Sequence, residues 1–201
     1  LFVKIIFDYF LAIFLVVILS PLFIFISLLL FLFSSSNIFF IHRRIGKKGE
    51  NFNLYKFRTM KHSRDKILSN YFLKYPKEKI NWDLNRKLKN DPRVTGIGYY
   101  LREFSLDELP QVFNVLKGEM SFIGPRPIVE DEIIKYGENF KYYKKNKPGL
   151  SGLWQVSGRN DTSYEERVAF DSLYAENISF LFDLKIFFKT FYVVLTKKGA
   201  Y

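Results

Sequence analysis

The hydrophobic and polar positions divide the chain into an apolar beginning and a mixed remainder. From Tyr9 to Phe33 there are 25 consecutive uncharged residues, which are mostly Leu, Ile, Phe and Val. A helix of this length can cross about 30 Å of hydrocarbon. The run is too long for a signal peptide and is not followed directly by a small-residue cleavage site, so it predicts a membrane segment.

Ser20 and Pro21 interrupt this apolar run near its middle. Proline removes a helix hydrogen bond and kinks or breaks the helix, and a serine hydroxyl can satisfy the freed carbonyl. Two topologies follow, a straight span and a re-entrant helix-break-helix that enters and leaves by one face. Hydropathy alone favours the span. The re-entrant form is weakly favoured by basic residues on both sides of the run, because two ends on one cytoplasmic face would both carry them. These residues are Lys4 before the run and 42–44 after it.

The remainder predicts short elements of both kinds. Alternation over residues 39–60 predicts two short strands around a turn at 46–53, and residues 61–90 predict a charged helical insertion whose aromatic residues could lie on the bilayer interface. Residues 163–177 predict a helix. Residues 179–195 are amphipathic and aromatic, which suits a helix lying on a membrane and equally one packed against the core. Glycines at 149, 152 and 158 allow close backbone approach to a ligand or a tight turn.

Charge distribution changes this picture more than overall composition does. The chain holds 31 Lys and Arg against 20 Asp and Glu, a net charge of +11, and residues 42–103 alone hold 17 against six. The excess of positive charge therefore directly follows the apolar run. Next to a membrane, each basic residue gains roughly 1 kcal/mol of binding free energy from its attraction to anionic headgroups. The absence of cysteine excludes disulfides and thiolate metal sites. His42 and His62 are too few for a histidine metal site, and we assign both to surface or juxtamembrane positions.

Residues 101–111 carry the candidate chemistry. Ser105 followed by Glu108, just before apolar positions, is the pattern of a capping box at a helix start, and Gly118 supplies a stop. Pro110 is awkward in such a helix and moves its expected start two or three residues later. A helix N-terminus favours ionised carboxylates, so Asp107 is expected to be an anion that can act as a nucleophile or metal ligand.

Neighbouring residues on a helix point about 100° apart. One carboxylate of the Asp107–Glu108 pair can therefore face a phosphorus atom while the other holds a cation. The alternative is that both acids only complement the helix dipole. Arg102 before the pair and Arg126 in the Gly124–Pro127 turn after it argue against this alternative, because their positive charges could converge on a phosphate there.

At these residues the chain resembles the bacterial sugar transferases, the monotopic phosphoglycosyl transferases. The resemblance covers nearly the whole chain in order. It rests on Arg102 with 105–111, on 117–127 (KGEMSFIGPRP), on 55–60 (YKFRTM) and on 147–159 (KPGLSGLWQVSGR). It implies a mainly α fold with a small β element. Residues 1–38 would form a re-entrant membrane helix-break-helix, and 39–201 a cytoplasmic interfacial catalytic domain with a C-terminal amphipathic helix.

The resemblance also implies a reaction. The donor would be a nucleoside diphosphate sugar, usually a UDP-sugar, and the acceptor undecaprenyl phosphate. Asp107 would take the sugar phosphate with release of UMP and then pass it to the lipid, as the first membrane step of glycoconjugate or surface polysaccharide synthesis. Glu108 completes the catalytic dyad and would bind the cofactor Mg²⁺. The expected substrate-binding residues are Arg102, Arg126, Arg159, Lys56, Arg58 and Gln111, with Lys56 and Arg58 either binding phosphate or supporting the fold.

The implied location is the bacterial inner membrane, with the catalytic domain on the cytoplasmic face and membrane lipids as partners. A homodimer is left open, and no nucleic acid is expected. The chain begins without Met, which suits a fragment of a longer protein with further membrane helices. Two other functions are considered. One is a membrane-tethered basic module that binds without chemistry, and the other is a metal-assisted hydrolase of lipid diphosphates.

Overall fold

The computed structural model describes residues 2–33, 37–85, 88, 90–158 and 162–196. Its α-helices are α1 (Phe2–Ile18), α2 (Ser20–Phe33), α3 (Arg64–Lys74), α4 (Pro76–Asn85), α5 (Gly96–Glu103), α6 (Val112–Leu116), α7 (Ile133–Tyr136), α8 (Phe140–Tyr143), α9 (Leu153–Ser157), α10 (Tyr164–Glu176) and α11 (Phe180–Leu195). The 3₁₀ turns are η1 (Lys47–Gly49), η2 (Leu106–Gln111), η3 (Glu130–Glu132) and η4 (Gly137–Asn139). The strands are β1 (Phe39–Ile45), β2 (Asn51–Phe57), β3 (Ser121–Ile123) and β4 (Gly149–Ser151). A mainly α fold with a small β element is thus confirmed.

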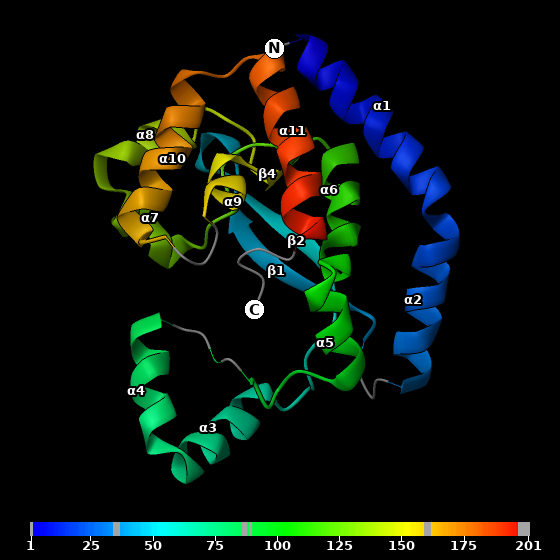
Figure 1. The fold of residues 1–201 in the computed structure, drawn as a ribbon, viewed down its shortest axis with the longest axis vertical. Helices are drawn as coiled ribbons and strands as arrows, with labels where there is room; N and C mark the ends of the chain where they lie inside the picture. Colours follow the sequence, from blue (N-terminus) through cyan, green and yellow to red (C-terminus); the bar gives the residue numbers. More distant parts are fainter. Residues whose placement is uncertain (1, 34–36, 86–87, 89, 159–161, 197–201) are drawn as a thin grey trace.

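The strands form two small pairs within the described residues. β1 and β2 are an antiparallel hairpin with Phe39 opposite Phe57 and Ile45 opposite Asn51, so the two predicted strands are confirmed with a shorter turn. β3 and β4 are parallel, and β1 reaches the rest of the domain through Ile45 N–H, which donates to Ile128 O at 2.9 Å. The helices surround these strands (Figure 1).

The apolar run forms α1 and α2, which bend at Leu19 and follow one side of the molecule (Figure 1). Pro21 has no N–H for the carbonyl of Val17, and the Ser20 hydroxyl donates to that carbonyl at 2.8 Å instead. Ser20 and Pro21 therefore interrupt the backbone hydrogen bonds at the bend between α1 and α2, while their role as a membrane helix break stays a prediction. Together Phe2–Phe33 are long and apolar enough, by length and composition, to cross a membrane, and most of this helix is exposed.

Buried polar contacts attach α1 to the rest of the domain. Lys4 Nζ lies 2.6 Å from Asp183 Oδ2 on α11 and donates to Ile123 O at 2.9 Å. One turn later, Asp8 accepts hydrogen bonds from Ser121 Oγ at 2.7 Å and from Phe122 N–H at 3.1 Å. Because Asp8 itself is buried, these bonds determine which face of α1 turns towards the domain.

The hydrophobic core continues this attachment. Ala12 of α1 belongs to the same buried cluster as Val115 of α6, Met120, and Ile186 and Val193 of α11. α11 buries this face, while Leu181, Phe188 and Leu195 on its other face are 71%, 67% and 81% exposed. The expectation that this helix packs against the core is therefore confirmed for one face, and its position on a membrane stays a prediction.

The insertion at 61–90 is helical, as predicted, and forms α3 and α4, which extend away from the other elements (Figure 1). Leu73 is 82% exposed, whereas Tyr71 packs against Phe72 and Tyr75. The charged residues and the exposed leucine leave this arm without a core of its own.

Two glycines of the 147–159 motif pack against the chain itself. A Cβ atom on Gly149 would collide with the Gly124 backbone nitrogen, and one on Gly152 with the Gly124 carbonyl oxygen. These glycines therefore allow β4 and the following turn to approach the Gly124–Pro127 turn closely.

We predict that Asp8→Ala destabilises the protein, because it leaves the buried Ser121 hydroxyl and Phe122 N–H without their acceptor. The expected loss is about 2 kcal/mol in the free energy of unfolding. Denaturant unfolding of the detergent-solubilised protein would measure it, with the exposed Asp131→Ala as control. Equal stability of the two variants would show that the Asp8 contacts do not hold α1.

Candidate active site

The backbone before the dyad turns sharply. α5 ends at Glu103, and Ser105 adopts a left-handed conformation (φ 56°, ψ 21°) that leads into η2. Ser105 makes no side-chain cap, so the predicted capping box is wrong. The reason is Pro110, which cannot be accommodated inside a regular α-helix and instead lies in a 3₁₀ segment. The α-helix begins only at Val112, and Gly118 follows it with φ 76°, as its expected role as a stop requires.

Asp107 lies on η2 and is only 9% exposed. Burial raises the pKa of its carboxyl group to about 6, the nearby charges of Lys56 and Arg102 oppose this shift, and Glu108 adds to it. The expected effect of a helix N-terminus was to lower the pKa of Asp107, whereas the structure shows a raised pKa. The carboxylate is still mostly ionised at pH 7.

Basic side chains from two other elements meet the dyad. Lys56 of β2 places Nζ 2.5 Å from Glu108 Oε1. Arg102, in the last turn of α5, donates from Nε to Thr59 Oγ1 at 2.9 Å. Lys56 and Arg102 thus lie close to the Asp107–Glu108 pair, and their expected role in binding substrate stays a prediction.

Arg126 belongs to a second polar cluster. Its guanidinium lies 5.4 Å from the centre of the Trp154 ring, and that of Arg167 lies 5.1 Å from the same ring. Glu132 pairs with Arg167 at 3.3 Å and with Arg44 at 3.7 Å. Burial disfavours the charged form of Glu132, but the Val129 N–H and these guanidinium groups hold its pKa below the usual value.

His42 lies between the two clusters, partly shielded from solvent, and its assignment to a surface or juxtamembrane position stays a prediction. It is half-buried on β1, with Nδ1 3.2 Å from Arg44 Nη2. Burial and the charges of Arg44 and Lys56 lower the pKa of His42 to about 4, so the ring is neutral at pH 7. The β1–β2 register brings residue 56 to the same face of the hairpin as residues 42 and 44. Their spacing in the sequence alone did not predict that these three residues would be neighbours.

The other predicted site residues have different positions. Arg58 donates to the backbone oxygens of Asn37 at 2.8 Å and Phe39 at 3.2 Å, which favours the supporting role among the two expected for it. Gln111 is 3% exposed at the end of η2, so its side chain is buried rather than on the surface. Arg159 lies outside the described residues.

The donor set for a cation is small. Among the described residues no group of three or more His, Cys, Asp or Glu converges on one point. Mg²⁺ commonly takes only one or two protein carboxylates and completes its shell with substrate phosphates and water. Asp107 and Glu108 fit this pattern for a cation that arrives with a diphosphate, although Glu108 already pairs with Lys56.

Comparison with known proteins identifies the family. The model of the bacterial sugar transferase family matches residues 1–197. The chain belongs to this family. It is 48% identical over 195 residues to the exopolysaccharide production protein ExoY of Sinorhizobium fredii, covering 97% of this chain and 86% of that protein. Over 160 residues it is 51% identical to the undecaprenyl-phosphate galactose phosphotransferase of Salmonella typhimurium, covering 80% of this chain and 34% of that one.

A third relative is the UDP-glucose:undecaprenyl-phosphate glucose-1-phosphate transferase of Escherichia coli. It is 36% identical over 203 residues, which cover 96% of this chain and 40% of that protein. The resemblance seen in the sequence is therefore confirmed, and the names of these relatives agree with the expected phosphoglycosyl transferase. As a sugar transferase the chain is an enzyme, which excludes a module that only binds.

We predict that Asp107→Asn stabilises the protein at alkaline pH. The folded-state pKa of about 6 lies above the unmodified value of 3.8, so ionised Asp107 opposes folding above pH 6 and neutral Asp107 does not below about pH 4. The variant should gain up to about 3 kcal/mol in the free energy of unfolding at pH 8 and much less at pH 4. Denaturant unfolding at both pH values measures this. Equal gains at the two pH values would contradict a buried, ionised Asp107.

Proposed function

We propose that this sugar transferase transfers a hexose 1-phosphate from a UDP-sugar to undecaprenyl phosphate through a covalent intermediate on Asp107. The observation that carries the proposal is the arrangement at η2, where a buried carboxylate lies beside Glu108, Lys56 and Arg102. The choice of substrates is supported by the names of the relatives from Salmonella typhimurium and Escherichia coli, which specify undecaprenyl phosphate and, in the second, UDP-glucose.

In the first step a carboxylate oxygen of Asp107 attacks the phosphorus that bears the sugar. The bond from that phosphorus to the bridging oxygen of the diphosphate breaks, and UMP leaves with the bond's electron pair. The product is an acyl phosphate that joins Asp107 to the sugar through one phosphate. Such a transfer needs charge neutralisation on the phosphate oxygens more than proton transfer, and Lys56 and Arg102 supply it.

In the second step a phosphate oxygen of the lipid attacks the same phosphorus. The Asp107 carboxylate leaves, and the lipid carries a diphosphate joined to the sugar. A carboxyl group with a pKa near 6 is both ionised enough at pH 7 to attack and a good leaving group. Burial of Asp107 excludes competing water, whose attack on the acyl phosphate would release the sugar phosphate unused.

We further propose Mg²⁺ as the cofactor, held by Glu108 together with the donor diphosphate. When bound, the cation neutralises charge on the diphosphate oxygens. The Lys56–Glu108 pair fixes the orientation of the Glu108 carboxylate, and the hydrogen bond to Thr59 holds Arg102. We assign Arg126, over Trp154 in the second cluster, to recognition of the donor beyond its reacting phosphate.

The membrane segment is proposed to be re-entrant, with the catalytic domain on the cytoplasmic face of the inner membrane. The support is that both ends of the apolar run are bound to the same domain. Lys4 and Asp8 bond to α11 and β3, and the segment after α2 becomes β1, which pairs with β2. A straight span would place these two attachments on opposite faces of the membrane, where one domain could not bind both.

The function is tested by incubating the protein with Mg²⁺ and a panel of UDP-sugars, first without lipid and then with undecaprenyl phosphate. We expect UMP and a sugar-phosphate mass adduct on Asp107 without lipid. Asp107→Asn should lower UMP release at least about 1,000-fold, because it removes the nucleophile. The exposed Asp131→Asn is the control. Full turnover by Asp107→Asn would remove Asp107 as nucleophile, and inorganic phosphate in place of UMP would favour the hydrolase.

Topology is tested with single cysteines, since the chain has none of its own. Cysteines replacing Val3, which is 57% exposed, and the exposed Lys47 would be labelled with an impermeant maleimide in sealed membrane vesicles. Both sites should react from the same face. Reaction from opposite faces would establish a span.

A further inference from the structure

One edge of the strand β2 is paired by a side chain instead of a strand. β1 occupies the other edge, and among the described residues no third strand joins this hairpin. The Tyr55 N–H donates to Asn114 Oδ1 at 3.1 Å, and Asn114 Nδ2 donates to the Asn53 carbonyl oxygen at 2.7 Å. Residues two apart on a strand direct their backbone groups to the same edge. The Asn114 carboxamide therefore makes the two hydrogen bonds that a neighbouring strand would make.

A third hydrogen bond determines which way the Asn114 amide points. Nδ2 also donates to Glu119 Oε2 at 2.7 Å, so both of its hydrogens have acceptors and Oδ1 is left for the Tyr55 N–H. Reversal of the amide would place Oδ1 against the Asn53 carbonyl and the Glu119 carboxylate, which cannot donate. Asn114 is 0% exposed, and an unpaired amide is unfavourable at a buried site. Glu119 therefore fixes the orientation in which Asn114 can bind β2.

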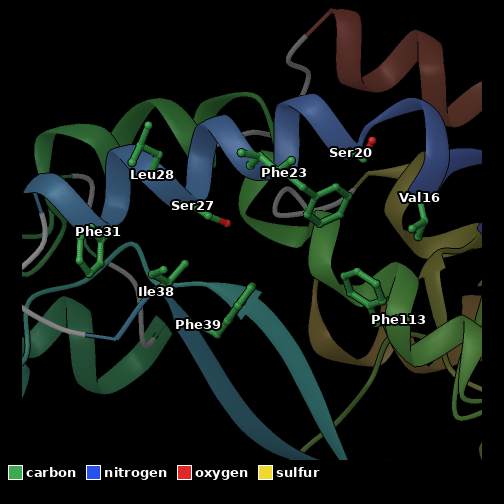
Figure 2. Close-up of a pocket in the computed structure, with 10 residues that line it drawn as sticks. Val16, Ser20, Phe23, Ser27, Leu28, Phe31, Ile38, Phe39 and Phe113 are labelled. Atoms are coloured by element: carbon green, nitrogen blue, oxygen red, sulfur yellow. The ribbon is translucent and has the colours of Figure 1, made fainter.

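The helix α6 and the turn that follows it direct three side chains to their partners. Gly118 follows the helix with φ 76°, and the Glu119 N–H then donates to the Asn114 carbonyl oxygen at 3.0 Å. Phe113, one residue before Asn114, points towards α2, where its ring lies 5.6 Å from that of Phe23 at the wall of an apolar groove (Figure 2). Because neighbouring helix residues point about 100° apart, α6 directs Phe113 to the apolar helix and Asn114 to β2.

The residue next to this bound edge is Lys56, which follows Tyr55 on β2. Its Nζ lies 2.5 Å from Glu108 Oε1. Burial raises the pKa of Asp107, and among the nearby charges that of Lys56 opposes the shift most strongly. η2, which carries both acids, continues directly into α6, which carries Asn114. Asn114 therefore connects the strand of Lys56 to the segment of the dyad.

Apolar contacts between α6 and β2 do not by themselves set the register of the strand. Leu54 and Val112 pack in one buried cluster with the apolar side chains around them, but such contacts are not directional. A slip of β2 by one residue would move Lys56 by about 3.3 Å and break its contact with Glu108. The hydrogen bonds at residues 53 and 55 require an acceptor and a donor at fixed positions, so they exclude such a slip.

We propose that Asn114 is a positioning residue for the reaction. By binding the free edge of β2 it holds Lys56 at the Asp107–Glu108 pair, and Glu119 orients its amide for this contact. The inference rests on the proposed function and deepens it, because it identifies what places a positive charge beside the nucleophile. Asn114 acts through the backbone of β2 and not through contact with the substrate.

The rate of UMP release in the first turnover of the detergent-solubilised protein, measured without lipid, tests this role. Asn114→Asp keeps the shape of the side chain but places an oxygen where Nδ2 donated to Asn53 and Glu119, so β2 loses its edge contact. The rate should fall about tenfold or more. In a Lys56→Met background the same substitution should cause no further fall, because Lys56 is the group through which Asn114 acts. Asn51→Asp, at the exposed start of β2, adds the same charge to the strand and should keep the wild-type rate.

The pH dependence of this rate distinguishes positioning from a general loss of structure. Asp107 is faced by Lys56 of β2, Arg102 of α5 and Glu108 of η2. Displacement of Lys56 removes the charge that most opposes the effect of burial, so the pKa of Asp107 should rise above about 6 and the acidic limb of the pH–rate profile should move to higher pH. Asn114→Asp and Lys56→Met should show this move alike, whereas a loss of folded protein lowers the rate at every pH.

Variants of Glu119 test the role without altering the buried amide itself. Glu119→Ala removes the acceptor that orients Asn114 and should move the acidic limb in the same direction, whereas Glu119→Gln keeps an acceptor oxygen and should keep the wild-type profile. If Asn114→Asp does not fold, Glu119→Ala combined with Lys56→Met decides in the same way. An additive loss in the double variant, or a wild-type profile in Glu119→Ala, would overturn the inference. Absence of UMP release by the wild type would instead refute the proposed function, so the two failures are distinguishable.

Discussion

The burial of one carboxylate beside an ion pair is the constraint on which the rest of the structure depends. Asp107 is removed from water on η2, and its charge is tolerated because Lys56 and Arg102 lie close by. Lys56 can do this only if β2 packs against η2, and its bond to Glu108 holds the two elements together. Burial disfavours the charged form of Asp107 and so raises the pKa of its carboxyl group.

A second constraint couples the membrane helix to this site. α1 and α2 expose most of their apolar surface, yet α1 buries Asp8 and bonds Lys4 to α11 and β3. Charged groups on an apolar helix are stable only when they are paired. The pairs therefore fix the rotation of the helix against the domain, and with it the side of α2 that faces β1 and α6. This fixed rotation holds the long apolar helix in one position relative to η2 and the rest of the domain.

Much of the organisation could be predicted because it depends on local patterns. The apolar run, the break at Ser20 and Pro21, the β1–β2 hairpin and the helix at 163–177 follow from periodicity and from proline chemistry. The capping box failed because two local rules conflicted at η2, and the exclusion of Pro110 from an α-helix prevailed over the Ser105 signal. Likewise, a helix N-terminus predicted a lowered pKa for Asp107, whereas burial, which no single stretch of sequence reveals, raised it.

The amino-acid sequence by itself determined the family and the long apolar N-terminal helix, because each depends on residues that are adjacent in the chain or repeat at a fixed interval. Only the tertiary structure decided which charges surround the dyad. Lys56 pairs with Glu108, which lies 52 positions away in the chain. The register of the β1–β2 hairpin places His42 beside Arg44 and on the same face as Lys56. Arg126 lies over Trp154 in a separate cluster. These placements depend on how strands and helices pack across long stretches of chain, and the side-chain types alone do not specify that packing.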